Sequence, residues 1–128
     1  MRQPQDLIFY GNCEEAVEFY EKAIGTKAHS YDGFLSPSDK GSSLIYQFKI
    51  DYDTIRCFNA GPNRKRMFGI NNSLSIYIKE ISRLRLLRDA LIKDSKEPHP
   101  LGSFIPLLPT IYYIADKFGV IWDLQIIR

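Results

Sequence analysis

The chain has 128 residues, of which 45% are hydrophobic and 25% are charged, and its formal net charge is +2 at pH 7. These values are ordinary for one globular domain, so they exclude an intrinsically disordered chain and predict neither a nucleic-acid nor a membrane partner. The two cysteines, Cys13 and Cys57, have no spacing typical of a zinc site or a disulfide framework. The first residues contain no long apolar run, so we expect neither a signal peptide nor a membrane span, and a reducing cytoplasm is the expected location.

The first half of the chain predicts a β-α-β-β-β unit. Residues 5–10 form a short apolar strand. An amphipathic helix follows at residues 11–25, with Asn12 and Glu15 as a capping pair and Gly25 at its end. A weak strand, an alternating strand and its hairpin partner come next, at residues 27–35, 43–50 and 54–61.

The second half repeats this order. A strand, a helix, a proline-broken segment with room for a short strand, and a hairpin are predicted at residues 73–78, 82–93, 96–110 and 111–127. The sequence therefore predicts an α+β fold of two βαβββ modules, at about residues 1–60 and about 73–128, in a single domain of residues 1–128. Each helix covers only one face of its sheet, so the remaining faces enclose either a cavity or a core.

Several stretches resemble a known superfamily. FYGNCEEAVEFYEKAIG resembles the opening of the vicinal oxygen chelate superfamily, which includes glyoxalase I, extradiol dioxygenases and bleomycin-binding proteins. CFNAGP, NNSLSIYI and ADKFGVIWDL resemble its PhnB-like branch, often labelled demethylubiquinone methyltransferase-like. The resemblance covers nearly the whole chain, and its most specific parts are EEAVEFY and DKFGVIW. This chain departs from the branch between Pro106 and Tyr113, where it lacks an insertion before the last hairpin.

The resemblance implies that the modules form a cupped mixed β-sheet with the helices on the outside, usually in a homodimer. In the enzymes of the superfamily, His and Glu side chains on four strands hold a divalent metal. In this sequence the corresponding positions are Gln5, Cys57, Ser73 and Asp123. One amide, one thiol, one hydroxyl and one carboxylate, with no His, make a poor ligand set for a first-row metal. We therefore expect no metal and no cofactor.

Asp123 is unusual because it interrupts the apolar run VIWDLQII. Strand alternation puts Asp123 and Gln125 on one face and Trp122 on the other, which packs on a helix. We therefore expect Asp123 to face the cup, together with Tyr77. A carboxylate there needs a hydrogen-bond partner, and the candidates are Gln5, Ser73, Tyr77 and ordered water. The predicted ligand-binding residues are Gln5, Cys57, Ser73, Tyr77 and Asp123.

The leading hypothesis is a homodimeric protein of this superfamily that binds a small molecule and has no intact His and Glu metal site. The alternative is a divergent metal-dependent lyase, isomerase or dioxygenase that uses the same cup. A third possibility is an assembly module whose cup is filled by its own side chains. Cys57 as a nucleophile would need a nearby base, and a buried inert thiol is the simpler interpretation. The identity of the ligand and the existence of any catalytic activity stay open at this stage.

Overall fold

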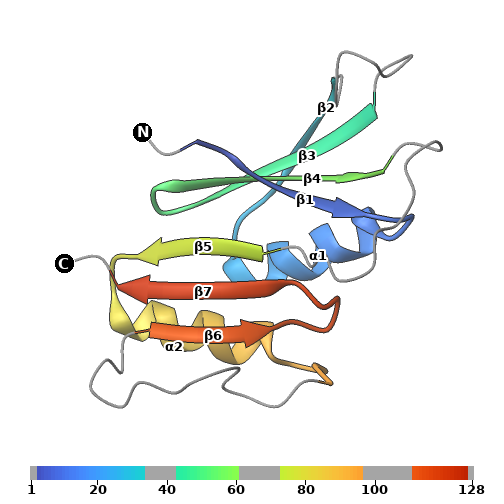
Figure 1. The fold of residues 1–128 in the computed structure, drawn as a ribbon. Coiled ribbons are helices and arrows are strands. Elements are labelled where there is room, and N and C mark those ends of the chain that lie inside the picture. The colour runs from blue at the N-terminus through green and yellow to red at the C-terminus, as the bar shows by residue number, and fades with distance from the viewer. Residues whose placement is uncertain (1–2, 34–42, 61–72, 97–110, 127–128) are drawn as a thin grey trace.

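A computed structural model describes residues 3–33, 43–60, 73–96 and 111–126 (Figure 1). The short strand predicted within residues 96–110 and the rim between Pro106 and Tyr113 fall almost wholly outside the described residues.

The first module forms a four-stranded sheet, called sheet A, in the order β1-β4-β3-β2. Its elements are β1 (Gln5–Phe9), α1 (Cys13–Ile24), β2 (His29–Gly33), β3 (Ser43–Ile50) and β4 (Asp53–Asn59). β1 runs parallel to β4, and the other two pairs are antiparallel. Gly25 ends α1 as predicted, since its backbone is left-handed with φ 78° and its N–H donates to the carbonyl of Glu21.

The second module forms sheet B, in the order β5-β7-β6. Its elements are β5 (Ser73–Ile78), α2 (Ile81–Leu91), β6 (Ile111–Ala115) and β7 (Ile121–Ile126). β5 is parallel to β7, and β6 is antiparallel to it. Each module therefore combines one helix with one mixed sheet, which confirms the predicted α+β class (Figure 1).

One continuous hydrophobic core joins the helices to both sheets. α1 packs on β4, α2 packs on all three strands of sheet B, and the two helices contact each other. The core takes alternate residues of each strand, such as Leu7 and Phe9 of β1 and Trp122 and Leu124 of β7. The opposite face of each sheet carries polar residues such as Arg56 of sheet A and Asp123 of sheet B, and in sheet A it also holds the buried Ile45 and Phe58. We call these two faces the open faces of sheets A and B.

The amino terminus of α1 is capped by a residue from another element. Asn12 makes no side-chain capping bond, so the predicted pairing of Asn12 with Glu15 is wrong. Instead, Oδ1 of Asn59, at the end of β4, accepts the N–H groups of Gly11 and Cys13 at 2.9 and 3.1 Å. An oxygen acceptor at this position satisfies N–H groups that have no partner within the helix, and it ties α1 to the end of β4.

Sheets A and B are joined by side chains along the free edge of β5, because no backbone ladder links them within the described ranges. The other edge of β5 pairs with β7. Oε1 of Gln5 accepts the Ser75 N–H at 2.8 Å, and Nε2 of Gln5 donates to the Ser75 carbonyl at 2.9 Å. The amide of Gln5 thus supplies one donor and one acceptor, as a peptide group of a neighbouring strand would.

Two carboxylates extend this junction along β5. The Oδ2 atoms of Asp53 and Asp51 accept the N–H groups of Tyr77 and Lys79 at 3.0 and 2.9 Å. Asp53 is only 1% exposed. Asp51 also pairs with Arg83 of α2, with 2.7 Å between Oδ1 and Nη1. Side chains of β1, of β4 and of the turn between β3 and β4 therefore accept the N–H groups of residues 75, 77 and 79, and they hold the two modules together.

Candidate functional site

The open face of sheet B carries a half-buried polar cluster centred on Asp123. Trp122 and Leu124 are fully buried in the core, so alternation places Asp123 and Gln125 on the opposite face. Nε2 of Gln125 donates to both carboxylate oxygens of Asp123, at 3.1 and 3.0 Å. Oγ of Ser75 donates to Oδ2 of Asp123 at a longer 3.4 Å. The structure therefore gives Asp123 two partners, Gln125 and Ser75, that the sequence analysis did not name.

The charge of Asp123 has no counter-ion within the part of the chain that the structure describes, since none of the ion pairs found there includes it. The open face of sheet A offers a contrast. There Asp6 accepts two hydrogen bonds from Arg56, at 2.7 and 3.0 Å, which neutralise its charge. A half-buried carboxylate held only by neutral donors keeps its capacity to meet a cation or a strong donor.

The sheet register brings tyrosines beside this cluster. Tyr113 of β6 and Ser75 of β5 lie directly opposite Asp123 on its two sides. Tyr77 of β5 lies opposite Gln125. Because directly paired strand residues point to the same face, Tyr113 and Tyr77 flank the carboxylate on the open face. Tyr113 is 41% exposed, so its side chain is accessible from outside.

The predicted site residues divide between two faces. Ser73, Tyr77 and Asp123 share the open face of sheet B, where Ser73 is exposed and the other two are half-buried. Gln5 lies at the junction and is committed to the backbone of Ser75. Cys57 is not part of the cluster, because it is fully buried in the core on the helix-facing side of sheet A. The structure therefore does not bring Cys57 together with Asp123.

Both thiols are in environments that disfavour the reactive thiolate. Burial, with a smaller contribution from Glu14, raises the pKa of Cys13 to about 12. Burial also raises the pKa of Cys57, and the proximity of Cys13 adds to this. Both cysteines are free and buried. A nucleophilic cysteine needs a depressed pKa and access to substrate, so neither thiol has the properties of a catalytic group.

The four positions that correspond to metal ligands in the superfamily do not fit a metal centre in this arrangement. Cys57 is buried in the hydrophobic core, and both polar atoms of the Gln5 amide are already bonded. Asp123 is then the one carboxylate of the set, next to a hydroxyl. Within the described residues, no group of three or more His, Cys, Asp or Glu side chains is placed to hold a metal ion.

A buried acidic residue that the sequence analysis did not single out has a structural role. Asp116, in the turn between β6 and β7, is 2% exposed. Oδ2 accepts the Tyr20 hydroxyl at 2.6 Å and Nε1–H of Trp122 at 2.9 Å, and Oδ1 accepts the N–H groups of Phe118 and Val120 at 2.8 and 3.1 Å. Burial raises the pKa of Asp116 above its ordinary value, and the four hydrogen bonds offset only part of that rise. Asp116 therefore links α1 of the first module to the hairpin of the second.

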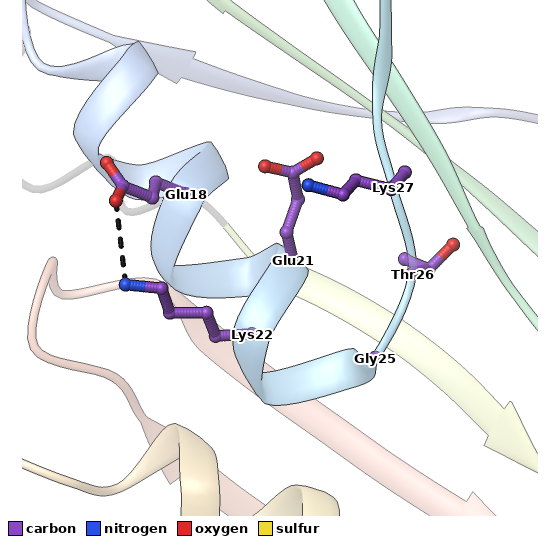
Figure 2. Close-up of a pocket in the computed structure, with 6 residues that line it drawn as sticks. All are labelled: Glu18, Glu21, Lys22, Gly25, Thr26 and Lys27. Carbon is purple, nitrogen blue, oxygen red and sulfur yellow. Dashed lines mark ion pairs between the residues drawn. The ribbon is translucent and has the colours of Figure 1, made fainter.

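A surface hollow of about 390 Å³ lies at the carboxyl end of α1 (Figure 2). Its lining residues are Glu18, Glu21, Lys22, Gly25, Thr26 and Lys27. Glu18 forms an ion pair with Lys22 at 3.5 Å, and Glu21 accepts the Ala28 N–H at 2.8 Å. The carboxylates of this hollow are thus used in local contacts, and we do not assign it as the candidate site.

The paired modules define the class of protein. Crystal structures with the same fold include protein PA1353 from Pseudomonas aeruginosa, at 20% identity and a TM-score of 0.72, with 98% of this chain and 97% of that chain covered. A glyoxalase/bleomycin resistance protein from Albidiferax ferrireducens T118 is 13% identical with a TM-score of 0.61, over 100% and 99% of the two chains. This chain therefore has the fold of the glyoxalase/bleomycin resistance proteins.

The family is more specific than the fold. The chain belongs to the family described as 3-demethylubiquinone-9 3-methyltransferase, whose sequence model matches residues 3–127. A solved structure described as a putative 3-demethylubiquinone-9 3-methyltransferase, PhnB protein, from Bacillus cereus is 19% identical, with a TM-score of 0.59 over 99% of this chain and 100% of that one. The resemblance to the PhnB-like branch is confirmed. No functionally curated protein matches the chain significantly.

No helix among the residues described in Figure 1 is long and apolar enough to cross a membrane.

Proposed function

We propose that this protein binds a small molecule on the open face of sheet B and that it needs no metal to do so. The observation that carries the proposal is the cluster of Asp123, Gln125 and Ser75, which is half-buried, hydrogen-bonded and without a counter-ion in the described residues. Polar anchors between aromatic side chains are typical of small-ligand sites. Of the residues predicted from the sequence, Ser73, Tyr77 and Asp123 remain in the proposed site.

The alternative is a divergent metal-dependent lyase, isomerase or dioxygenase. It is less well supported, because Cys57 lies away from Asp123 and Gln5 is engaged at the junction. Methyl transfer, which the family description names, is not part of the proposal. The sequence contains no glycine-rich loop of the kind that holds a nucleotide-like cofactor. A cytoplasmic location is part of the proposal and is compatible with two free thiols.

A ligand screen tests the proposed function. We expect some small molecules to raise the melting temperature, with about 2.7 kcal/mol of added stability when the ligand is at a hundred times its Kd. In ¹H–¹⁵N spectra the same molecules should shift the backbone signals of Ser75, Asp123 and Gln125. Hits that shift only residues around the hollow of Figure 2 would contradict this proposal. Stabilisation by Zn²⁺ or Ni²⁺ alone would favour the metal-dependent alternative.

We also propose that the protein is a homodimer. Several large hydrophobic side chains are exposed on the single chain, including Leu86 at 71% and Tyr52 at 57%. Burying such side chains against a second copy of the chain would remove apolar surface from water, which favours association. Sedimentation equilibrium at micromolar concentration should therefore give twice the 14.8 kDa mass of one chain. A single species at the mass of one chain under these conditions would rule the dimer out.

A further inference from the structure

The charge of Asp123 restricts what the open face of sheet B can bind. Its carboxylate is half-buried, and Nε2 of Gln125 contacts both oxygens from one side. An ionised carboxylate offers about four acceptor positions. The donors that contact it within the described residues, Gln125 and Ser75, occupy at most three of them. The carboxylate therefore keeps capacity for a further donor, and its negative charge disfavours an anionic one.

Asp6 is a carboxylate on an open face whose charge is compensated within the protein. Asp6, on the open face of sheet A, receives two charge-assisted hydrogen bonds from Arg56. Asp123 has only neutral donors among the described residues. A positive charge supplied from outside would complete the Asp123 cluster in the way that Arg56 completes the pair with Asp6.

The neighbouring aromatic side chains suit the same kind of ligand. Tyr113 lies directly opposite Asp123 across β6 and β7, and Tyr77 lies two register positions further along, opposite Gln125. Ammonium groups are attracted to the faces of aromatic rings within about 6 Å of the ring centroid. A carboxylate flanked by two tyrosines offers an ammonium group both a counter-charge and aromatic contacts.

We propose that the open face of sheet B binds a small aromatic amine in its cationic form, with Asp123 as the counter-charge and Tyr113 as an aromatic contact. This inference rests on the proposed function, and it names the chemical class of the ligand. A divalent metal is a poorer occupant because Asp123 is the only carboxylate among the cluster and its neighbours in register. An aromatic carboxylate is disfavoured by repulsion between like charges.

Three probes of nearly equal shape test the charge requirement at pH 7: 2-phenylethylamine, 2-phenylethanol and phenylacetate. Binding is followed in ¹H–¹⁵N spectra, where the side-chain amide of Gln125 reports directly on the carboxylate it contacts. We expect 2-phenylethylamine to bind at least about tenfold more tightly than the alcohol, which is the usual effect of a hydrogen bond to a charged group. Phenylacetate should bind more weakly than either.

Matched variants locate the effect. Asp123→Asn keeps the shape and should abolish the preference for the amine, whereas Asp32→Asn, the same change on the exposed edge strand β2, should leave it intact. Tyr113→Leu provides a second variant that leaves the carboxylate unchanged. It should weaken the binding of the amine severalfold more than the binding of the alcohol. Dispersed backbone signals in each variant establish that it is folded.

The outcomes separate this inference from the proposed function. If the alcohol or phenylacetate shifts sheet B signals as strongly as the amine does, or if Asp123→Asn keeps the preference, the ligand class is wrong while the binding face stands. If none of the three probes shifts any sheet B signal at millimolar concentration, and the ligand screen also finds no molecule that does, both are wrong.

Discussion

Replacing Asp116 with alanine is expected to lower the free energy of unfolding by about 4 kcal/mol or more at pH 7. The change removes the acceptor of four donors: the Tyr20 hydroxyl, the Trp122 indole N–H and two backbone N–H groups. Each buried donor left without a partner costs about 1–3 kcal/mol, and release of the buried charge offsets part of the total. The total free energy of unfolding of a small domain is about 5–15 kcal/mol. Urea unfolding should therefore show a much lower midpoint for the variant than for the wild type.

Tyr20→Phe is the matched control for Asp116→Ala. It removes one donor and leaves the carboxylate with three, so its cost should be about 1–1.5 kcal/mol. If Asp116→Ala unfolds no more easily than Tyr20→Phe, the network does not hold the two modules together. Asp116→Asn should fall between them, since an amide keeps one acceptor oxygen.

The pH dependence of Asp116→Asn has a defined sign. Burial raises the pKa of Asp116 in the folded state, so above the unfolded pKa of about 3.9 the folded protein holds more protons at this site than the unfolded chain. The contribution of Asp116 to stability is therefore fully present below that pH and declines as the pH rises through the folded pKa. Because asparagine does not titrate, the stability difference between the wild type and Asp116→Asn should be larger near pH 3.5 than at pH 7.

The strongest family signals in the sequence concern folding. The stretches EEAVEFY and DKFGVIW are far apart in the chain. A hydrogen bond nevertheless joins Tyr20, the last residue of the first stretch, to Asp116, the first residue of the second. Trp122 closes the same network. These residues allowed the fold and the family to be predicted correctly. They carry no information about the ligand, because all of them point into the core.

The site was only partly predicted from the sequence, and strands β7 and β4 show why. In β7, buried and half-buried residues alternate cleanly, so the face of Asp123 followed from the sequence. In β4, Cys57 and Phe58 are adjacent and both buried, although they point to opposite faces. Ile55 and Cys57 alternate with half-buried Thr54 and Arg56, which indicates that Cys57 shares the core face of Ile55. The correspondence with the superfamily grouped Cys57 with Asp123 in spite of this pattern.

Long-range polar contacts were beyond the sequence analysis for a different reason. Asn59 caps α1 by accepting the N–H of Cys13, although the two residues are 46 positions apart in the sequence. Gln5 and Ser75 are 70 positions apart. Local patterns such as an Asn before a helix describe only neighbours in the chain. Asn59 supplies the capping hydrogen bond that the sequence assigns to Asn12. The capping motif is therefore present in the sequence, although Asn12 itself makes no capping bond.

Gln5→Glu distinguishes the junction from a metal site, and it is expected to lower the free energy of unfolding by about 2 kcal/mol. Glutamate can still accept the Ser75 N–H, but it cannot donate to the Ser75 carbonyl and sets a negative charge against that oxygen. Gln3→Glu, the same chemical change at an exposed position just before β1, is the matched control and should have almost no effect.

The two roles of Gln5 predict opposite results when metal is added. A carboxylate is a better ligand for a divalent metal than an amide, so a hidden metal site would make Gln5→Glu more stable than the wild type in the presence of Zn²⁺ or Ni²⁺. The junction predicts that Gln5→Glu stays less stable with or without metal, because the lost donor is not restored. Thermal unfolding of the wild type, Gln5→Glu and Gln3→Glu with and without each metal therefore decides between a residue that joins two sheets and one that binds an ion.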